Sequence, residues 1–189
     1  TCLGINALGA ANTNYSVAIG ANALSGVTSG LNNTSIGMNA GSLLTTGSYN
    51  TIIGTNSQPS TATISGEFVL GSNQVNNLRC NDTTISTLSD ERDKTNIVDI
   101  PLGLDFINTL RPVSFDWNRR DGSMIGKKDF GFIAQELKIA QDATPYADNM
   151  RLVHTDNPDK WEADPMKTFP IMMKAIQELS AKVEALENA

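Results

Sequence analysis

The segment STLSDERDKTNI, residues 86–97, divides the sequence into two parts of different composition. Before it, the chain is rich in Gly, Asn, Ser and Thr, and residues 1–88 carry only Glu67, Arg79 and Asp82 as charged side chains. Nearly all of the 14 basic and 20 acidic residues therefore follow Ser89. This change predicts two domains, a repetitive one over residues 1–85 and a charged, helix-forming one over residues 86–189.

The first part is an internal repeat. A glycine followed two positions later by an asparagine recurs in CLGINAL (2–8), AIGANAL (18–24), SIGMNAG (35–41), IIGTNSQ (52–58) and VLGSNQV (69–75). A short β-prone piece precedes most of these glycines. A fixed period with one strand and one turn per copy predicts a β-roll or β-solenoid. Glycine permits a positive φ at the turn, and asparagine tolerates this conformation or forms a ladder with the next copy. Residues 1–75 resemble the repeats of trimeric adhesin heads and viral fibre shafts.

The end of the chain is the clearest helix in the sequence. In FPIMMKAIQELSAKVEALE, residues 169–187, apolar side chains recur in steps of three and four: Phe169, Met172, Ile176, Leu179, Val183 and Leu186. This spacing is typical of the a/d seam of a coiled coil. Two interpretations stay open. The helix either packs on its own domain or forms a coiled coil of two or three strands with the same helix of other copies.

Composition disfavours several classes of function. The net charge of -6 argues against nucleic-acid binding, which requires a basic face. No apolar stretch is long enough to span a membrane. Cys2, Cys80 and His154 each lack a partner at the spacing of a metal site, so neither a metal nor a cofactor is expected. Because the sequence begins inside a repeat, we expect further fibre domains upstream in the same polypeptide.

One pair of residues at the boundary has the chemistry of a catalytic dyad. Ser89 lies five residues before Lys94. A serine hydroxyl is a weak nucleophile without an adjacent base, and lysine is a base only when neutral, which burial or nearby positive charge favours. Arg92 is expected to supply positive charge, whereas Asp93 opposes it. Because five residues is not a helical step, the pair needs a turn or a neighbouring subunit to close.

Four motifs in the second part resemble a known family. SDERDKTNI, LDFINTLRPVSFDW, FGFIAQEL and AIQELSAKVEALE occur in the order and spacing of the endosialidase-type intramolecular chaperone domain, the self-cleaving C-terminal peptidase domain of phage tailspikes and tail fibres. The resemblance, over residues 86–187, implies a homotrimeric chaperone that folds the preceding fibre and then cuts itself off. It also implies that Ser89 and Lys94 are catalytic and that the Ser89–Asp90 bond is cut. Attack by Ser89 on its own carbonyl would form a strained four-membered ring, so the Leu88 carbonyl or a neighbour's serine is easier geometrically.

The sequence thus predicts an α+β homotrimer, in which a repetitive β shaft precedes a mixed α/β chaperone domain that ends in a coiled-coil helix. The expected partners are the chain's own copies, the upstream fibre domains and, for the full fibre, a host-surface glycan or receptor. The expected location is a virion tail fibre or spike assembled in the host cytoplasm. Two alternatives remain, a trimerisation cap that does not cleave and an adhesin head that only binds. An enzyme for an external substrate is disfavoured, because no second nucleophile or metal constellation is apparent.

Overall fold

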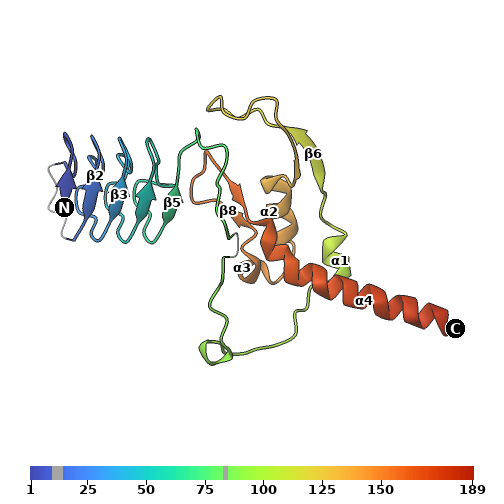
Figure 1. Ribbon diagram of the computed structural model, residues 1–189. Coiled ribbons are helices and arrows are strands. Elements are labelled where there is room, and N and C mark those ends of the chain that lie inside the picture. The colour runs from blue at the N-terminus through green and yellow to red at the C-terminus, as the bar shows by residue number, and fades with distance from the viewer. Residues whose placement is uncertain (10–14, 83–84) are drawn as a thin grey trace. The chain divides into compact units, whose positions relative to one another are not determined.

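The computed structural model describes residues 1–9, 15–82 and 85–189 (Figure 1). This part of the chain forms two compact units. One comprises Thr1–Arg79 and Asn118–Ile125, and the other comprises Cys80–Trp117 and Gly126–Ala189. The predicted boundary between residues 85 and 86 falls in an irregular, exposed stretch.

The first unit contains a parallel sheet with one strand per repeat. Its five strands neighbour one another in sequence order: β1 (Cys2–Leu3), β2 (Val17–Ile19), β3 (Thr34–Ile36), β4 (Thr51–Ile53) and β5 (Phe68–Leu70). Each residue pairs with the equivalent residue of the next copy, as Cys2 does with Ala18 and Thr34 with Thr51. The repeat period is therefore the register of the sheet. The finer assignment of these strands to a β-roll or solenoid stays a prediction.

The Gly-x-Asn signature has a direct physical cause in this stack. Gly20 adopts a φ of +126°, and a Cβ on it would lie 2.6 Å from the carbonyl carbon of Gly37, which excludes any other residue. Asn22 has a φ of 57°, and its side-chain amide donates to Oδ1 of Asn39 at 3.0 Å. Asn39 donates in turn to Asn56 at 2.9 Å. The predicted asparagine ladder between successive copies is therefore confirmed.

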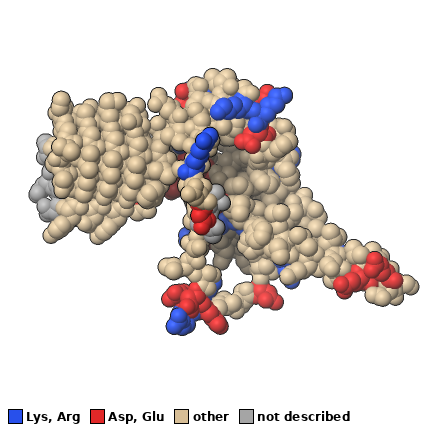
Figure 2. All heavy atoms as spheres, in the orientation of Figure 1, with Lys and Arg blue, Asp and Glu red and all other residues tan. Residues whose placement is uncertain are grey.

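The two faces of the strands differ in burial. The middle residues Ala18, Ser35 and Ile52 are fully buried, and they face an interior that is filled largely by Leu24 and Leu44. The following position points outward and forms a column of branched aliphatic residues, defined here as the outer column: Leu3, Ile19, Ile36, Ile53 and Leu70. On the face shown in Figure 2, this stack carries no acidic or basic side chains.

The second unit is mixed α/β. Its helices are α1 (Leu104–Ile107), α2 (Ala134–Asp142), α3 (Ala147–Met150) and α4 (Phe169–Glu187), with 3-10 turns η1 (Glu91–Asp93) and η2 (Pro165–Thr168). Its strands form two antiparallel pairs, β6 (Val113–Asp116) with β7 (Lys128–Gly131) and β8 (Val153–His154) with β9 (Glu162–Ala163). The predicted mixed α/β class and long C-terminal helix are confirmed.

One hydrophobic core holds the second unit together. Its buried side chains come from α1 to α4, the strand β8 and the residue just before β8: Phe106, Leu137, Met150, Leu152, Val153 and Ile171. A polar contact also fixes α1 on α4, because the Leu104 amide donates to Glu178 Oε2 at 2.8 Å. Such a carboxylate at a helix N-terminus satisfies an otherwise unpaired backbone donor. None of the helices described in the chain has the length and apolar character that crossing a membrane requires.

Candidate functional site

A short turn brings Ser89 and Lys94 together. Asp90 caps η1, since its carboxylate accepts the Arg92 amide at 2.9 Å. The Lys94 amide then donates to the Glu91 carbonyl at 3.0 Å and closes the turn. Aspartate is favoured at such a cap because its side chain satisfies a free backbone donor. The local sequence Ser-Asp-Glu-Arg-Asp-Lys therefore folds the chain back within one turn.

Lys94 contacts two atoms of Ser89. Its Nζ donates to Ser89 Oγ at 2.6 Å and to the Ser89 carbonyl oxygen at 3.1 Å. The amine thus reaches both the hydroxyl group and the carbonyl of the Ser89–Asp90 peptide bond. Both residues are exposed in the single chain. A serine hydroxyl with a lysine amine in hydrogen-bond reach is the arrangement that lysine-assisted nucleophilic attack requires.

Arg92 and Asp93, the charged residues next to Lys94, make different contacts. Arg92 forms a two-pronged ion pair with Asp90, at 2.9 Å from Nε to Oδ1 and 2.6 Å between the second nitrogen and Oδ2. The Arg92 hydrogen bonds lower the pKa of the Asp90 carboxyl group and raise the pKa of the guanidinium group. Asp93 is exposed, and its amide donates to the Asp90 carbonyl at 3.2 Å. The charge of Arg92 is thus directed at Asp90.

The apolar positions of α4 divide between two faces. Ile171 is 2% exposed and Ala175 is 5% exposed, so this face packs on the domain. The six predicted seam residues are between 45% and 78% exposed: Phe169, Met172, Ile176, Leu179, Val183 and Leu186. One face of the helix therefore packs on its own domain, while the seam stays uncovered in the single chain. The two interpretations of the sequence are compatible, because they concern different faces.

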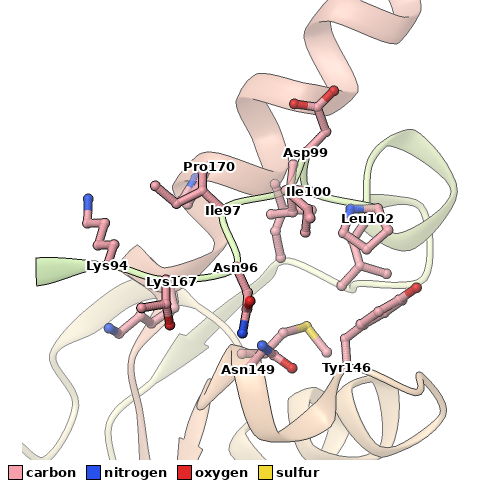
Figure 3. Close-up of a pocket in the computed structure, with 15 residues that line it drawn as sticks. Lys94, Asn96, Ile97, Asp99, Ile100, Leu102, Tyr146, Asn149, Lys167 and Pro170 are labelled. Atoms are coloured by element: carbon pink, nitrogen blue, oxygen red, sulfur yellow. The ribbon is translucent and has the colours of Figure 1, made fainter. Parts of the chain in front are cut away.

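A cavity of about 850 Å³ lies within the second unit, beside the Ser89–Lys94 turn. Its walls are residues 94–102, the α3 region with Tyr146 and Asn149, the turn η2 with Lys167, and the start of α4 with Pro170 (Figure 3). Sequence reasoning did not single out this cavity. No motif or regular spacing connects residues 94–102 with Tyr146 or Lys167, so only the tertiary packing brings these segments together.

The described residues offer no metal centre. Among them, no group of three or more His, Cys, Asp and Glu side chains is placed to hold an ion. Cys2 and Cys80 are exposed free thiols. His154 lies on β8, where it pairs in the backbone register with Glu162.

Comparison with known families gives a match that begins at the Ser89–Lys94 turn. Residues 89–145 match the model of the Peptidase_S74 family, described as the chaperone of endosialidase. The chain contains an endosialidase-type chaperone domain. The match begins at Ser89 and includes the Lys94 turn, α1, the β6–β7 pair and α2. No curated protein and no solved structure matches the chain. The family supports a chaperone role in the folding of a phage tail fibre or spike polypeptide.

Proposed function

We propose that this domain trimerises, folds the repetitive shaft before it, and then releases itself by cutting the Ser89–Asp90 bond. The observation that carries the proposal is the contact of Lys94 Nζ with both Ser89 Oγ and the Ser89 carbonyl oxygen, at the start of the segment that matches the family. Ser89 is the proposed nucleophile and Lys94 the proposed base. The stacked strands before the site form the proposed β-roll shaft.

The chemistry requires Lys94 in its neutral form. The amine takes the Ser89 hydroxyl proton as the oxygen attacks the carbonyl carbon, and it then gives a proton to the departing amide nitrogen. A solvated lysine keeps its proton at neutral pH, whereas burial favours the neutral amine. Both side chains are exposed in the single chain. Assembly would supply the burial and would therefore couple cleavage to trimer formation.

Two uncovered apolar surfaces support a homotrimer. The seam of α4 is one, and the outer column of the shaft is the other, with Leu3 68%, Ile36 39% and Leu70 50% exposed. A sheet face in contact with water usually alternates with polar residues, so a continuous aliphatic column favours contact between chains.

The repeat itself explains why a chaperone is needed. Chains with equivalent copies every 17 residues, as in the pairing of Thr34 with Thr51, can associate one copy out of register and lose few contacts. Parallel, non-local β pairing is also slow and leaves strand edges exposed. A globular trimeric domain would hold three C-termini in one register and raise their local concentration. Later cleavage would remove the domain through which the shaft could unfold again, and would leave a kinetically stable fibre.

Intact-mass measurement of four proteins tests the cleavage. We expect the wild-type trimer to yield two fragments that meet at Ser89–Asp90, and to do so faster as pH rises, because only neutral lysine accepts a proton. Ser89→Ala removes the nucleophile and Lys94→Ala the base, so both chains should stay whole. Lys94→Arg should also stay whole, since guanidinium does not lose its proton in proteins. Ser180→Ala, at an exposed serine of α4 that lies off the seam, is the matched control and should be cut normally.

A trimerisation cap that does not cleave is the second candidate. The exposure of both Ser89 and Lys94 in the single chain favours it, because a solvated lysine is a poor base. The same measurement separates the two candidates. If the wild-type chain stays whole after long incubation as a trimer, the non-cleaving cap is the correct function. If the Ser89→Ala chain is cut, Ser89 is not the nucleophile.

A further inference from the structure

The cavity beside the dyad is open and mostly apolar. Its lining includes the well-buried Met150 and Ile171 together with Ile100, Leu102 and Pro170. Lys94 belongs both to this lining and to the Ser89 contact. A peptide seated in the cavity would therefore lie next to the proposed base.

The segment just before the proposed cut has apolar side chains with nothing over them. Ile85 is 94% exposed and Leu88 is 96% exposed. Two branched aliphatic side chains with almost no cover, three residues apart, are the kind of anchors that an apolar cavity binds. The chain thus carries an uncovered segment, Ile85–Asp90, and an unfilled cavity.

Charge makes the two surfaces complementary. Ser89 is followed by two acidic residues, Asp90, which pairs with Arg92 in the single chain, and Glu91, whereas the cavity has Lys94 and Lys167 in its lining. In Figure 3 the two lysines are drawn on one side of the cavity and Asp99, its one acidic lining residue, on the other. A segment with an apolar anchor followed by acidic residues could place Leu88 in the apolar part and its carboxylates near the lysines.

The geometry of the bond explains why a second copy is the occupant. Ser89 Oγ and the Ser89 carbonyl carbon belong to one residue, so attack within that residue closes a four-membered ring. Attack on the Ser89 carbonyl of another chain forms no ring. The dyad of one copy is therefore incomplete as a peptidase for Ser89–Asp90 until another copy presents its segment.

We propose that the cavity of each copy receives the Ile85–Asp90 segment of a second copy, whose Ser89–Asp90 bond is then cut by the Ser89–Lys94 pair of the first. This inference rests on the proposed self-cleavage and adds to it the direction, from one chain to another. Ser89 Oγ of the first copy bonds to the Ser89 carbonyl carbon of the second, and Lys94 takes the hydroxyl proton. The bond to the Asp90 nitrogen breaks, and Lys94 returns the proton to that nitrogen. Water then hydrolyses the ester, which restores the serine hydroxyl and leaves a new carboxylate on the shaft.

Mixed trimers test the direction of cleavage. A tagged Ser89→Ala chain is co-expressed with an excess of untagged wild type, trimers are isolated by the tag, and the mass of the tagged chain is measured. The inference predicts that the tagged Ser89→Ala chain, which stays whole in its own homotrimer, is cut at the bond before Asp90 by its wild-type neighbours. If the wild-type chains are cut and the tagged chain in the same trimers stays whole, cleavage is within one chain and the inference is wrong. If wild-type homotrimers stay whole, the proposed cleavage fails and the inference with it.

Two further variants test the cavity as the docking place. Leu88→Asp should slow the cutting of the chain that carries it by about ten- to a hundredfold, because it removes the buried anchor. Asn149→Trp should fill the cavity and slow homotrimer cleavage by a similar factor, whereas Asp148→Trp, at the adjacent exposed residue outside the lining, should not. Native mass spectrometry must show trimers for all three. Unchanged cleavage in both Leu88→Asp and Asn149→Trp would overturn the docking.

Discussion

Replacing Ile176 by alanine should weaken the proposed trimer without unfolding the domain. Ile176 is 59% exposed in the single chain, and a coiled-coil seam would cover that exposed part. The change removes about three carbon atoms worth about 0.8 kcal/mol each when buried, so the exposed fraction gives about 1.4 kcal/mol per copy and about 4 kcal/mol per trimer. This corresponds to about a thousandfold larger dissociation constant. Because alanine is a strong helix former, α4 itself should persist.

The assay is sedimentation equilibrium or native mass spectrometry over a series of concentrations. Gln177→Ala is the matched control, because it alters the next exposed residue of α4 and lies off the seam. Ile171→Ala supplies the contrast. That residue is 2% exposed within the domain core, so its loss should cost about 2–5 kcal/mol of folding stability. Equal trimer dissociation for Ile176→Ala and Gln177→Ala would refute the assignment of this face to an interface between copies.

Two contacts of the second unit give further predictions. In Gly103→Ala, the new Cβ would overlap the Glu178 carboxylate, so this carboxylate must move away from the Leu104 amide. The expected loss is about 1–3 kcal/mol in chemical denaturation, with a smaller loss for Glu178→Gln, and an unchanged midpoint in both would contradict the capping role. The Arg111 hydrogen bond lowers the pKa of Glu136, so this pair stabilises the fold above the ordinary pKa of glutamate and loses its effect as pH falls through the lowered value. Thermal unfolding of Glu136→Gln should therefore match wild type in acid and fall below it near neutrality, and a difference independent of pH would contradict the assignment.

The features that the sequence predicts well are those that repeat. One strand per copy follows from a period that every copy shares, and the Gly-x-Asn signature follows from a close backbone approach at Gly20 and a ladder through Asn22 and Asn39. The C-terminal helix follows from its regular apolar spacing. Each of these features depends on contacts between equivalent or neighbouring residues, which a pattern in the sequence records.

The features that the sequence could not predict depend on contacts between unrelated segments. The steps of three and four in α4 indicate the seam, but they do not show that Ile171 and Ala175 form a separate face against the core. The need for a turn between Ser89 and Lys94 was apparent from the spacing, whereas the pairing of Arg92 with Asp90 was not. The cavity could not be predicted from the sequence at all, because its lining combines residues 94–102 with helical segments much later in the chain.

Exposure of the dyad connects the chaperone role with the timing of the proposed cut. In the single chain Ser89 and Lys94 are both exposed to water, and a lysine serves as a base only where burial or nearby positive charge favours its neutral form. The segment Ile85–Asp90 is also unseated in that state, so neither the base nor the substrate is ready. Docking of one copy's segment into another copy's cavity would bury Lys94 and present the bond in the same step. Premature release would leave a shaft without the domain that fixes its register, and the proposed site, which requires two copies, would prevent this outcome.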